Sequence, residues 1–149
     1  VMYGNILLAE GDVITAQKFF ENVIESRIPI GKAEAYNNLG VIKLSEGKLE
    51  KAKSFFKRAL SLDKNQPFAH INLAQIYDTE NKYFFAYYHY KMFLKNSGRD
   101  IPDEIKERVK FLSKYVLFQS ARFLIIILAS SGIFIIILRR IKLNKQRNY

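Results

Sequence analysis

The chain has 149 residues, of which 49% are hydrophobic, and it carries a formal net charge of +10. It contains no cysteine, so disulfide bonds and thiolate metal sites are excluded. Residues 1–100 hold 14 basic and 11 acidic side chains while residues 101–149 hold 10 and 3, so the basic excess is concentrated at the end. A stripe that would neutralise a nucleic-acid backbone is therefore not evident, and we expect no nucleic-acid partner.

Three pairs of helices are predicted in the first hundred residues, each pair joined by a short turn. The turn signals are Gly11-Asp12, Gly47 and Glu80-Asn81-Lys82, since Gly and Asn commonly end a helix. The helices are expected at 2–10, 12–26, 33–46, 48–61, 67–80 and 82–96. They form an incomplete first unit at 1–32, a second unit at 33–66 and a third at 67–98. The first helix is expected to begin upstream of Val1, as in a fragment of a longer chain.

The second unit, 33–66, has a spacing that its neighbours repeat. Small residues at its eighth and twentieth positions, Gly40 and Ala52, let two helices approach closely, and Phe56 at the twenty-fourth fills the seam. The same places hold Ala74, Ala86 and Tyr90 in the third unit, and Gly4, Ala16 and Phe20 in the first. A hairpin of this size cannot bury its apolar face alone, so the units must stack. The pattern resembles the tetratricopeptide repeat family, whose period is 34 residues, and the resemblance implies an all-α solenoid of helical hairpins that binds proteins.

The second helix of the third unit is aromatic nearly all round, which is typical of a helix buried on both sides. Its Phe84 and Tyr88 would face outward unless another element covers them. A capping helix is predicted at 101–116, because a proline and two acids stand at its start. This helix has one apolar stripe, formed by Ile105, Val109, Leu112 and Val116. We expect the stripe to lie against Phe84 and Tyr88 and so to close the stack.

Residues 117–138 are predicted to form a transmembrane helix. The run Phe123 to Leu138 has sixteen residues without a charge, which is about 24 Å of helix against a hydrocarbon core of about 30 Å. The residues before this run complete the span, and Arg122 near one edge can reach the headgroups. A basic tail at 139–149, which begins with Arg139, Arg140 and Lys142, ends the span. The alternative is a buried core helix, but the chain offers no partner of comparable hydrophobicity.

The charges that flank the span bear on its orientation. The tail holds five Lys and Arg residues and no acid, which favours the cytoplasmic side for the tail. The repeats would then lie outside the cytoplasm, as in a single-pass protein of the bacterial inner membrane. Five basic residues on the other side of the span weaken this preference. The alternative is a tail-anchored protein with cytosolic repeats, which resembles the mitochondrial and peroxisomal fission adaptors.

Catalysis is not expected from this sequence. The two histidines, His70 and His89, lack a paired carboxylate or a second histidine at ligand spacing, and we expect both to have structural roles. No glycine loop that could hold a phosphate and no pair of nucleophile and base is evident. We therefore expect neither an enzyme, nor a metal site, nor a cofactor.

The resemblance implies a groove lined by the first helix of each unit, which would bind a protein or peptide ligand. Asn and Gln side chains at adjacent helical turns can hydrogen-bond the backbone of an extended peptide. An ordinary polar helix surface would carry the same residue types. The sequence predicts a membrane-anchored scaffold or adaptor, and the alternative is an accessory structural subunit of a membrane complex. The groove residues are Asn5 from the first unit, Glu34, Asn37, Asn38 and Val41 from the second, and Phe68, Ile71, Asn72 and Gln75 from the third.

Overall fold

The computed structural model describes residues 1–98 and 100–147, without the side chains at 133–134, 137–138 and 143–147. Throughout this part of the chain the regular secondary structure is helical. The chain divides into two compact units, Val1–Leu112 and Ser113–Tyr149. The helices are α1 Met2–Ala9, α2 Val13–Glu25, α3 Lys32–Ser45, α4 Leu49–Leu62, α5 Pro67–Thr79, α6 Tyr83–Asn96 and α7 Asp103–Arg147.

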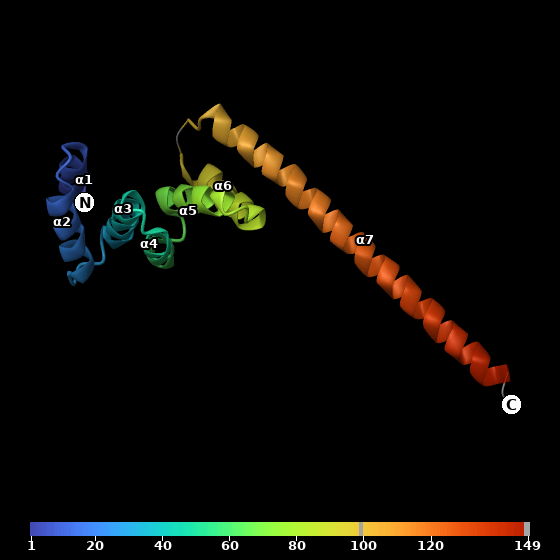
Figure 1. The fold of residues 1–149 in the computed structure, drawn as a ribbon. Helices are drawn as coiled ribbons and strands as arrows, with labels where there is room; N and C mark the ends of the chain where they lie inside the picture. Colours follow the sequence, from blue (N-terminus) through green and yellow to red (C-terminus); the bar gives the residue numbers. More distant parts are fainter. Residues whose placement is uncertain (99, 148–149) are drawn as a thin grey trace. The chain divides into compact units, whose positions relative to one another are not determined.

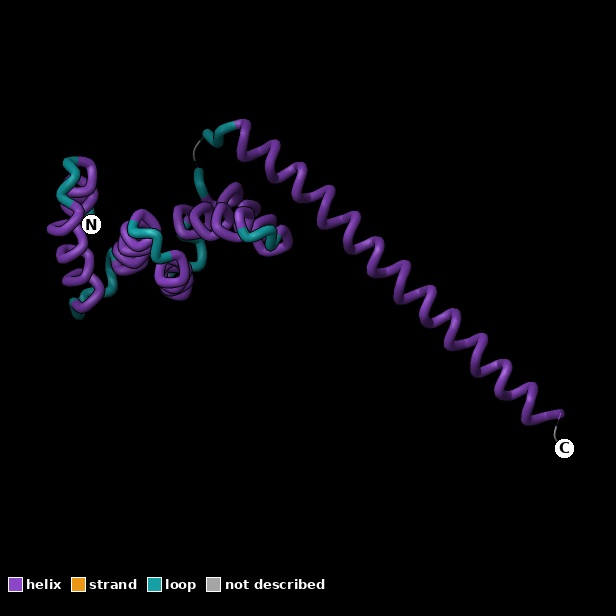
Figure 2. Tube along the Cα trace, in the orientation of Figure 1, coloured by secondary structure: helices purple, strands orange, loops and turns teal. Residues whose placement is uncertain are grey.

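Helices α1 to α6 form three hairpins in sequence, α1 with α2, α3 with α4 and α5 with α6 (Figure 1). Short loops join the helices within and between the hairpins (Figure 2). Contacts of α2 with α3 and of α4 with α5 stack each hairpin on the next. Every bound of these six helices lies within one residue of the prediction, and the expected all-α solenoid is confirmed.

The turns inside the hairpins share one backbone conformation. Gly11, Gly47 and Asn81 have φ angles of 84°, 73° and 57°, all in the left-handed region. Glycine adopts this region without a steric cost, and asparagine tolerates it better than most residues. In the third hairpin the Tyr83 hydroxyl donates a hydrogen bond to Asn81 Oδ1 at 2.6 Å. The turn signals in the sequence therefore mark the chain reversals correctly.

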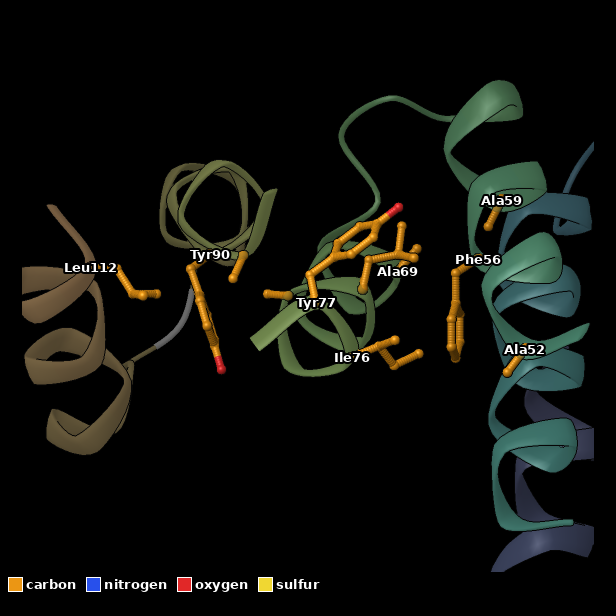
Figure 3. Packing of buried hydrophobic residues seen from close by; sticks show 11 residues of the cluster. Ala52, Phe56, Ala59, Ala69, Ile76, Tyr77, Tyr90 and Leu112 are labelled. Atoms are coloured by element: carbon orange, nitrogen blue, oxygen red, sulfur yellow. The ribbon is translucent and has the colours of Figure 1, made fainter. Parts of the chain in front are cut away.

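The core is built from rings that lie over small residues. Phe56 on α4 and Phe20 on α2 are both completely buried. A Cβ added to Gly40 would lie 2.5 Å from a carbon of the Phe56 ring, and one added to Gly4 would lie 2.6 Å from the Phe20 ring. Figure 3 shows Phe56 between Ala52 on its own helix and Ile76 of the next hairpin. In the first two hairpins the close approach of the helices therefore depends on a residue without a side chain.

The first turns of α7 belong to the same unit as the hairpins. Leu112 is completely buried, and Ile105 and Val109 pack against the cluster that contains Tyr90. Figure 3 shows the Leu112 side chain directed toward Tyr90. Arg108 adds two hydrogen bonds to Asp78 of α5, of 2.7 Å from Nε and 2.5 Å from Nη2. This segment therefore docks on the last hairpin through both apolar and ionic contacts, as a capping helix would.

The prediction that the capping stripe covers Phe84 and Tyr88 is wrong. Their side chains remain 51% and 56% exposed. Instead Tyr83, Tyr87 and Tyr90 pack in the cluster that the stripe joins. These tyrosines are three or four residues apart and share one face of α6, while Phe84 and Tyr88 each lie one residue further, about 100° around the helix. The aromatic residues of α6 thus lie on two faces, one packed against the capping segment and one exposed.

In the second unit α7 continues as a helix to Arg147, and large apolar side chains on it are exposed. Leu117 is 71% exposed and Phe123 66%. The hydroxyls of Ser130 and Ser131 donate to the backbone carbonyls of Ile127 and Leu128, at 2.8 Å and 2.9 Å. Within the described residues one stretch, Asp103–Gly132, is long and apolar enough to cross a membrane. Residues 148–149 of the expected basic tail lie outside the described part.

Gly40→Ala should destabilise the stack by about 1–3 kcal/mol, because the new methyl group forces Phe56 out of its place in a closely packed core. The free energy of unfolding can be measured by denaturant titration of the full chain in detergent, followed by circular dichroism. Ser54→Ala on the exposed side of α4 is the control and should change this value by less than about 0.5 kcal/mol. Equal stabilities for both variants would contradict the close approach at Gly40.

Candidate functional site

The first helices of the three hairpins, α1, α3 and α5, are bridged by one chain of side-chain hydrogen bonds. Asn72 Nδ2 donates to Asn37 Oδ1 at 3.0 Å, and Asn37 Nδ2 donates to Asn38 Oδ1 at 3.3 Å. Asn38 Nδ2 donates to Asn5 Oδ1 at 2.6 Å, and Asn5 Nδ2 donates to Glu34 Oε1 at 3.0 Å. We call these five residues the amide ladder. All five were predicted to line the groove, and the structure brings them together.

The members of the amide ladder differ in exposure. Asn5 and Glu34 are exposed, and Asn38 and Asn72 are half-buried. Asn37 is only 5% exposed, so it lies beneath the surface and its position favours a bridging role between α3 and α5. A side-chain amide has two N–H donors and an oxygen with two lone pairs. Each ladder bond uses one of these, so the exposed and half-buried amides retain hydrogen-bonding capacity toward solvent.

Apolar side chains lie on the same first helices as the ladder. Val41 on α3 and Phe68 on α5 are 40% and 45% exposed, Ile71 is half-buried and Gln75 is exposed. Exposed apolar side chains on the same helices as amides with unused donors and acceptors give a surface that can both exclude water and form hydrogen bonds. All nine predicted groove residues lie on α1, α3 and α5, and among them only Asn37 is buried.

Phe68 takes part in two neighbouring clefts at one end of the first helices. The cleft shared with the second hairpin has a volume of about 380 Å³, and Glu34 of the amide ladder also lines it. The other cleft, of about 180 Å³, is shared with Phe93 of α6 and Ile101 of the following loop. Two recesses beside one exposed ring can receive side chains of a partner that extends along the ladder.

A larger cleft of about 640 Å³ lies beside Gln75, between α5, α6 and the first turns of α7. The ion pair between Asp78 and Arg108 forms part of its lining, as does Tyr90. Burial raises the pKa of the Tyr90 hydroxyl, and the neighbouring Asp78 carboxylate adds to the rise. Sequence reasoning missed this cleft, because it depends on where the capping segment docks.

The two histidines meet inside the third hairpin, which the sequence reading did not anticipate. His70 Nε2 donates to the carbonyl of Lys64 at 3.0 Å, so in the neutral ring its Nδ1 accepts. His89 Nδ1 then donates to His70 Nδ1 at 2.9 Å, and the His89 ring stacks on Tyr77 with centroids 5.5 Å apart. Burial lowers the pKa of His89 to about 4, with His70 and Lys57 contributing. The pair is a structural link between α5 and α6.

The second hairpin contains the signal that could have revealed this pair. Tyr36 and Phe55 occupy the positions of His70 and His89 in the preceding unit, and their ring centroids lie 6.1 Å apart. The repeat thus brings its fourth and twenty-third positions together. In the part of the chain that the structure describes, no group of three or more His, Asp or Glu side chains is arranged to hold a metal ion.

The basic residues predicted to flank a membrane span lie on the second unit. Arg122, Arg139, Arg140 and Lys142 are all exposed on α7. The Arg122 guanidinium lies 5.8 Å from the centre of the Phe118 ring, and it donates to Gln119 Oε1 at 3.4 Å. Its side chain therefore extends back along the helix, away from the uncharged run that starts at Phe123.

These features define a stack of helical hairpins with a polar first-helix face. Residues 33–66 match the tetratricopeptide repeat family model, so the chain contains such a repeat at the position predicted for the second unit. A curated relative, the type IV pilus assembly protein PilF of Pseudomonas aeruginosa, is 29% identical over 69 residues. The match covers 46% of this chain and 27% of that protein, so the likeness spans about a quarter of the relative's length.

Solved structures share the fold. A structure of Pseudomonas aeruginosa PilF superposes with a TM-score of 0.67 at 23% identity, over 79% of this chain and 52% of that one. PilW, described as a widely conserved type IV pilus biogenesis factor, gives 0.57 at 18% identity, over 81% and 60%. The Sgt2 TPR domain of Aspergillus fumigatus gives 0.59 at 16% identity, over 80% and 78%. At these identities the likeness establishes the architecture.

The histidine pair makes the stability of the third hairpin depend on pH. In the unfolded chain His89 binds a proton as the pH falls below its ordinary pKa of 6.5, whereas in the folded chain it does so only near pH 4. The free energy of unfolding therefore decreases as the pH falls between these two values. The loss should be about 1–3 kcal/mol, the lower end allowing for solvent around the partly exposed ring.

The control for this pH effect is a double variant, His70→Tyr with His89→Phe, which copies the Tyr36 and Phe55 pair of the second hairpin. The free energy of unfolding of both proteins can be measured between pH 4 and 7. The parent should gain about 1–3 kcal/mol of stability relative to the variant as the pH rises from 4 to 6.5. A difference that does not change with pH would show that the pKa of His89 is not lowered in the folded state.

Proposed function

We propose that the chain is a membrane-anchored scaffold whose amide ladder and adjacent apolar residues bind a protein partner in extended conformation. The observation that carries this proposal is the continuous amide ladder across three hairpins, with Val41 and Phe68 exposed on the same helices. A polar row held in place by its own hydrogen bonds loses little conformational entropy when a partner binds, which favours affinity.

The dimensions of a helical stack suit an extended partner. Packed helices lie about 8–10 Å apart, and an extended chain advances about 3.3 Å per residue. Each hairpin would therefore meet roughly every third residue of the partner. The amides of Asn5, which is exposed, and of Asn38 and Asn72, which are half-buried, can pair with its backbone N–H and C=O groups. The clefts beside Phe68 receive apolar side chains.

Anchoring in a bilayer is supported by the second unit. An aqueous protein would bury side chains such as Leu117 and Phe123, which here are 71% and 66% exposed on a helix long enough to span a membrane. Burying such residues in lipid is favourable by about 25 cal/mol per Å² of apolar surface. The exposed Arg139, Arg140 and Lys142 would remain with the headgroups, on the cytoplasmic side of the membrane.

The relatives favour a role in building a membrane-associated complex. PilF is described as a type IV pilus assembly protein and PilW as a type IV pilus biogenesis factor. We extend this to the present chain as a proposal: its partner is a protein component of an envelope assembly, and the repeats lie outside the cytoplasm. The anchored α7 would keep the groove close to the membrane in which such a complex forms.

The groove can be tested with a photo-crosslinking amino acid placed at Val41 in the full chain, in its native membrane. A discrete crosslinked product is expected at this position, and none is expected at Ser54 on the exposed side of α4, which is the matched control. Asn38→Ala should reduce the product roughly fivefold, since one lost hydrogen bond costs about 1 kcal/mol.

Crosslinks of equal strength at Val41 and Ser54 would contradict a partner-binding groove. A product that forms only from positions on α7 within residues 117–132 would favour the alternative, an accessory subunit that contacts its complex through the membrane helix.

A further inference from the structure

The last hairpin exposes aromatic side chains at the start of α6. Phe84, Phe85 and Tyr88 are 51%, 58% and 56% exposed, and their positions fall within about 100° of the helix circumference. Phe111 on the docked part of α7 is 53% exposed. We call these four residues the aromatic end. Exposed apolar rings are unfavourable in water, and the capping segment leaves the three rings of α6 uncovered.

The aromatic end lies where the chain leaves the first unit. The Arg108 guanidinium is 5.9 Å from the centre of the Tyr83 ring and 4.9 Å from that of Phe111. Tyr83 is the first residue of α6, and Leu112, next to Phe111, is the last residue of the unit. The docked part of α7 therefore runs toward the start of α6, and it reaches the end of the unit beside that helix start.

Only a short segment separates this point from the expected membrane span. If the span begins at residue 117, Leu112 stands five residues before it, or about 7 Å along a helix. The headgroup and interfacial layers of a bilayer add about 5–8 Å on each side of the hydrocarbon core. Along the chain, Leu112 is thus separated from the expected span by about the thickness of the headgroup layer.

We propose that the aromatic end of the last hairpin is inserted in the headgroup layer of the bilayer that α7 enters. This inference rests on the proposed membrane anchoring. Aromatic side chains gather at the membrane interface because their rings are apolar while the layer still admits water and polar groups. The bilayer thereby covers Phe84 and Tyr88, which the capping segment does not.

The charges of α6 agree with a lipid surface as the occupant. The helix contains no acidic residue, and it carries the exposed Lys91 and Lys95. Lys82 precedes it, and its side chain is 52% exposed and forms an ion pair with Glu80 at 2.8 Å. Basic residues near a membrane surface are attracted to anionic headgroups. Both the exposed aromatic rings and the basic side chains of α6 are thus suited to contact a bilayer.

The absence of tryptophan from the sequence allows a direct test. Single tryptophans are introduced in the full chain as Phe84→Trp and Phe85→Trp, and the chain is placed in lipid nanodiscs whose acyl chains carry bromine near the headgroup end. Tyr3→Trp on α1, at a position 58% exposed, is the matched control far along the stack. Phe123→Trp reports on the membrane helix itself. Circular dichroism confirms that each variant is folded.

Fluorescence at positions 84 and 85 should fall to about half in brominated lipid, since interfacial aromatic rings lie near that depth. Tyr3→Trp should be unchanged and Phe123→Trp should be quenched. If Phe123→Trp is quenched while positions 84 and 85 behave like Tyr3→Trp, the inference is overturned and the anchoring stands. If Phe123→Trp is not quenched, the anchoring and the inference both fall. A blue shift at position 84 that depends on protein concentration, without quenching, would assign the surface to a second copy and overturn the inference.

Discussion

The structure depends on the contact between a buried ring and a residue with almost no side chain. Phe20 lies over Gly4 and Phe56 over Gly40, so that a single added methyl group would collide with the ring in either place. This contact fixes how closely the two helices of a hairpin approach. Because each hairpin is too small to bury its own apolar face, the spacing then carries into the next hairpin through shared core residues such as Ile76 and Leu73.

The amide ladder is a consequence of that spacing. Asn37 and Asn72 lie 35 positions apart in sequence, and their side chains form a 3.0 Å hydrogen bond only because α3 and α5 are held side by side. Burying an amide such as Asn37 costs free energy unless its hydrogen-bond partners are present. The ladder therefore stabilises the one packing register of the hairpins in which those partners meet. The same rows that link the hairpins also form the surface that a partner would meet. Stability and the proposed binding therefore share residues.

The sequence predicted the repeat architecture well, because small residues, rings and turn residues recur at fixed places, and each of these has a local physical reason. The residues of the first-helix face were predictable from the repeat positions alone. The hydrogen bonds within the face, the burial of Asn37 and the meeting of His70 with His89 were not, because they depend on side-chain geometry between helices. The covering of Phe84 and Tyr88 was predicted wrongly, since an apolar stripe shows that a helix docks but not which face of its neighbour it meets. The docked face also carries the hydrogen bonds from Arg108 to Asp78.

A double-mutant cycle between Asn37 and Asn72 tests most directly whether the hairpins are joined into one polar face. The free energy of unfolding of the full chain in detergent would be measured for the parent, Asn37→Ala, Asn72→Ala and the double variant. A hydrogen bond across the hairpins predicts a coupling energy of about 1 kcal/mol. Additive effects of the two substitutions would show that α3 and α5 are not linked in this way, and the account of a continuous ladder would be contradicted.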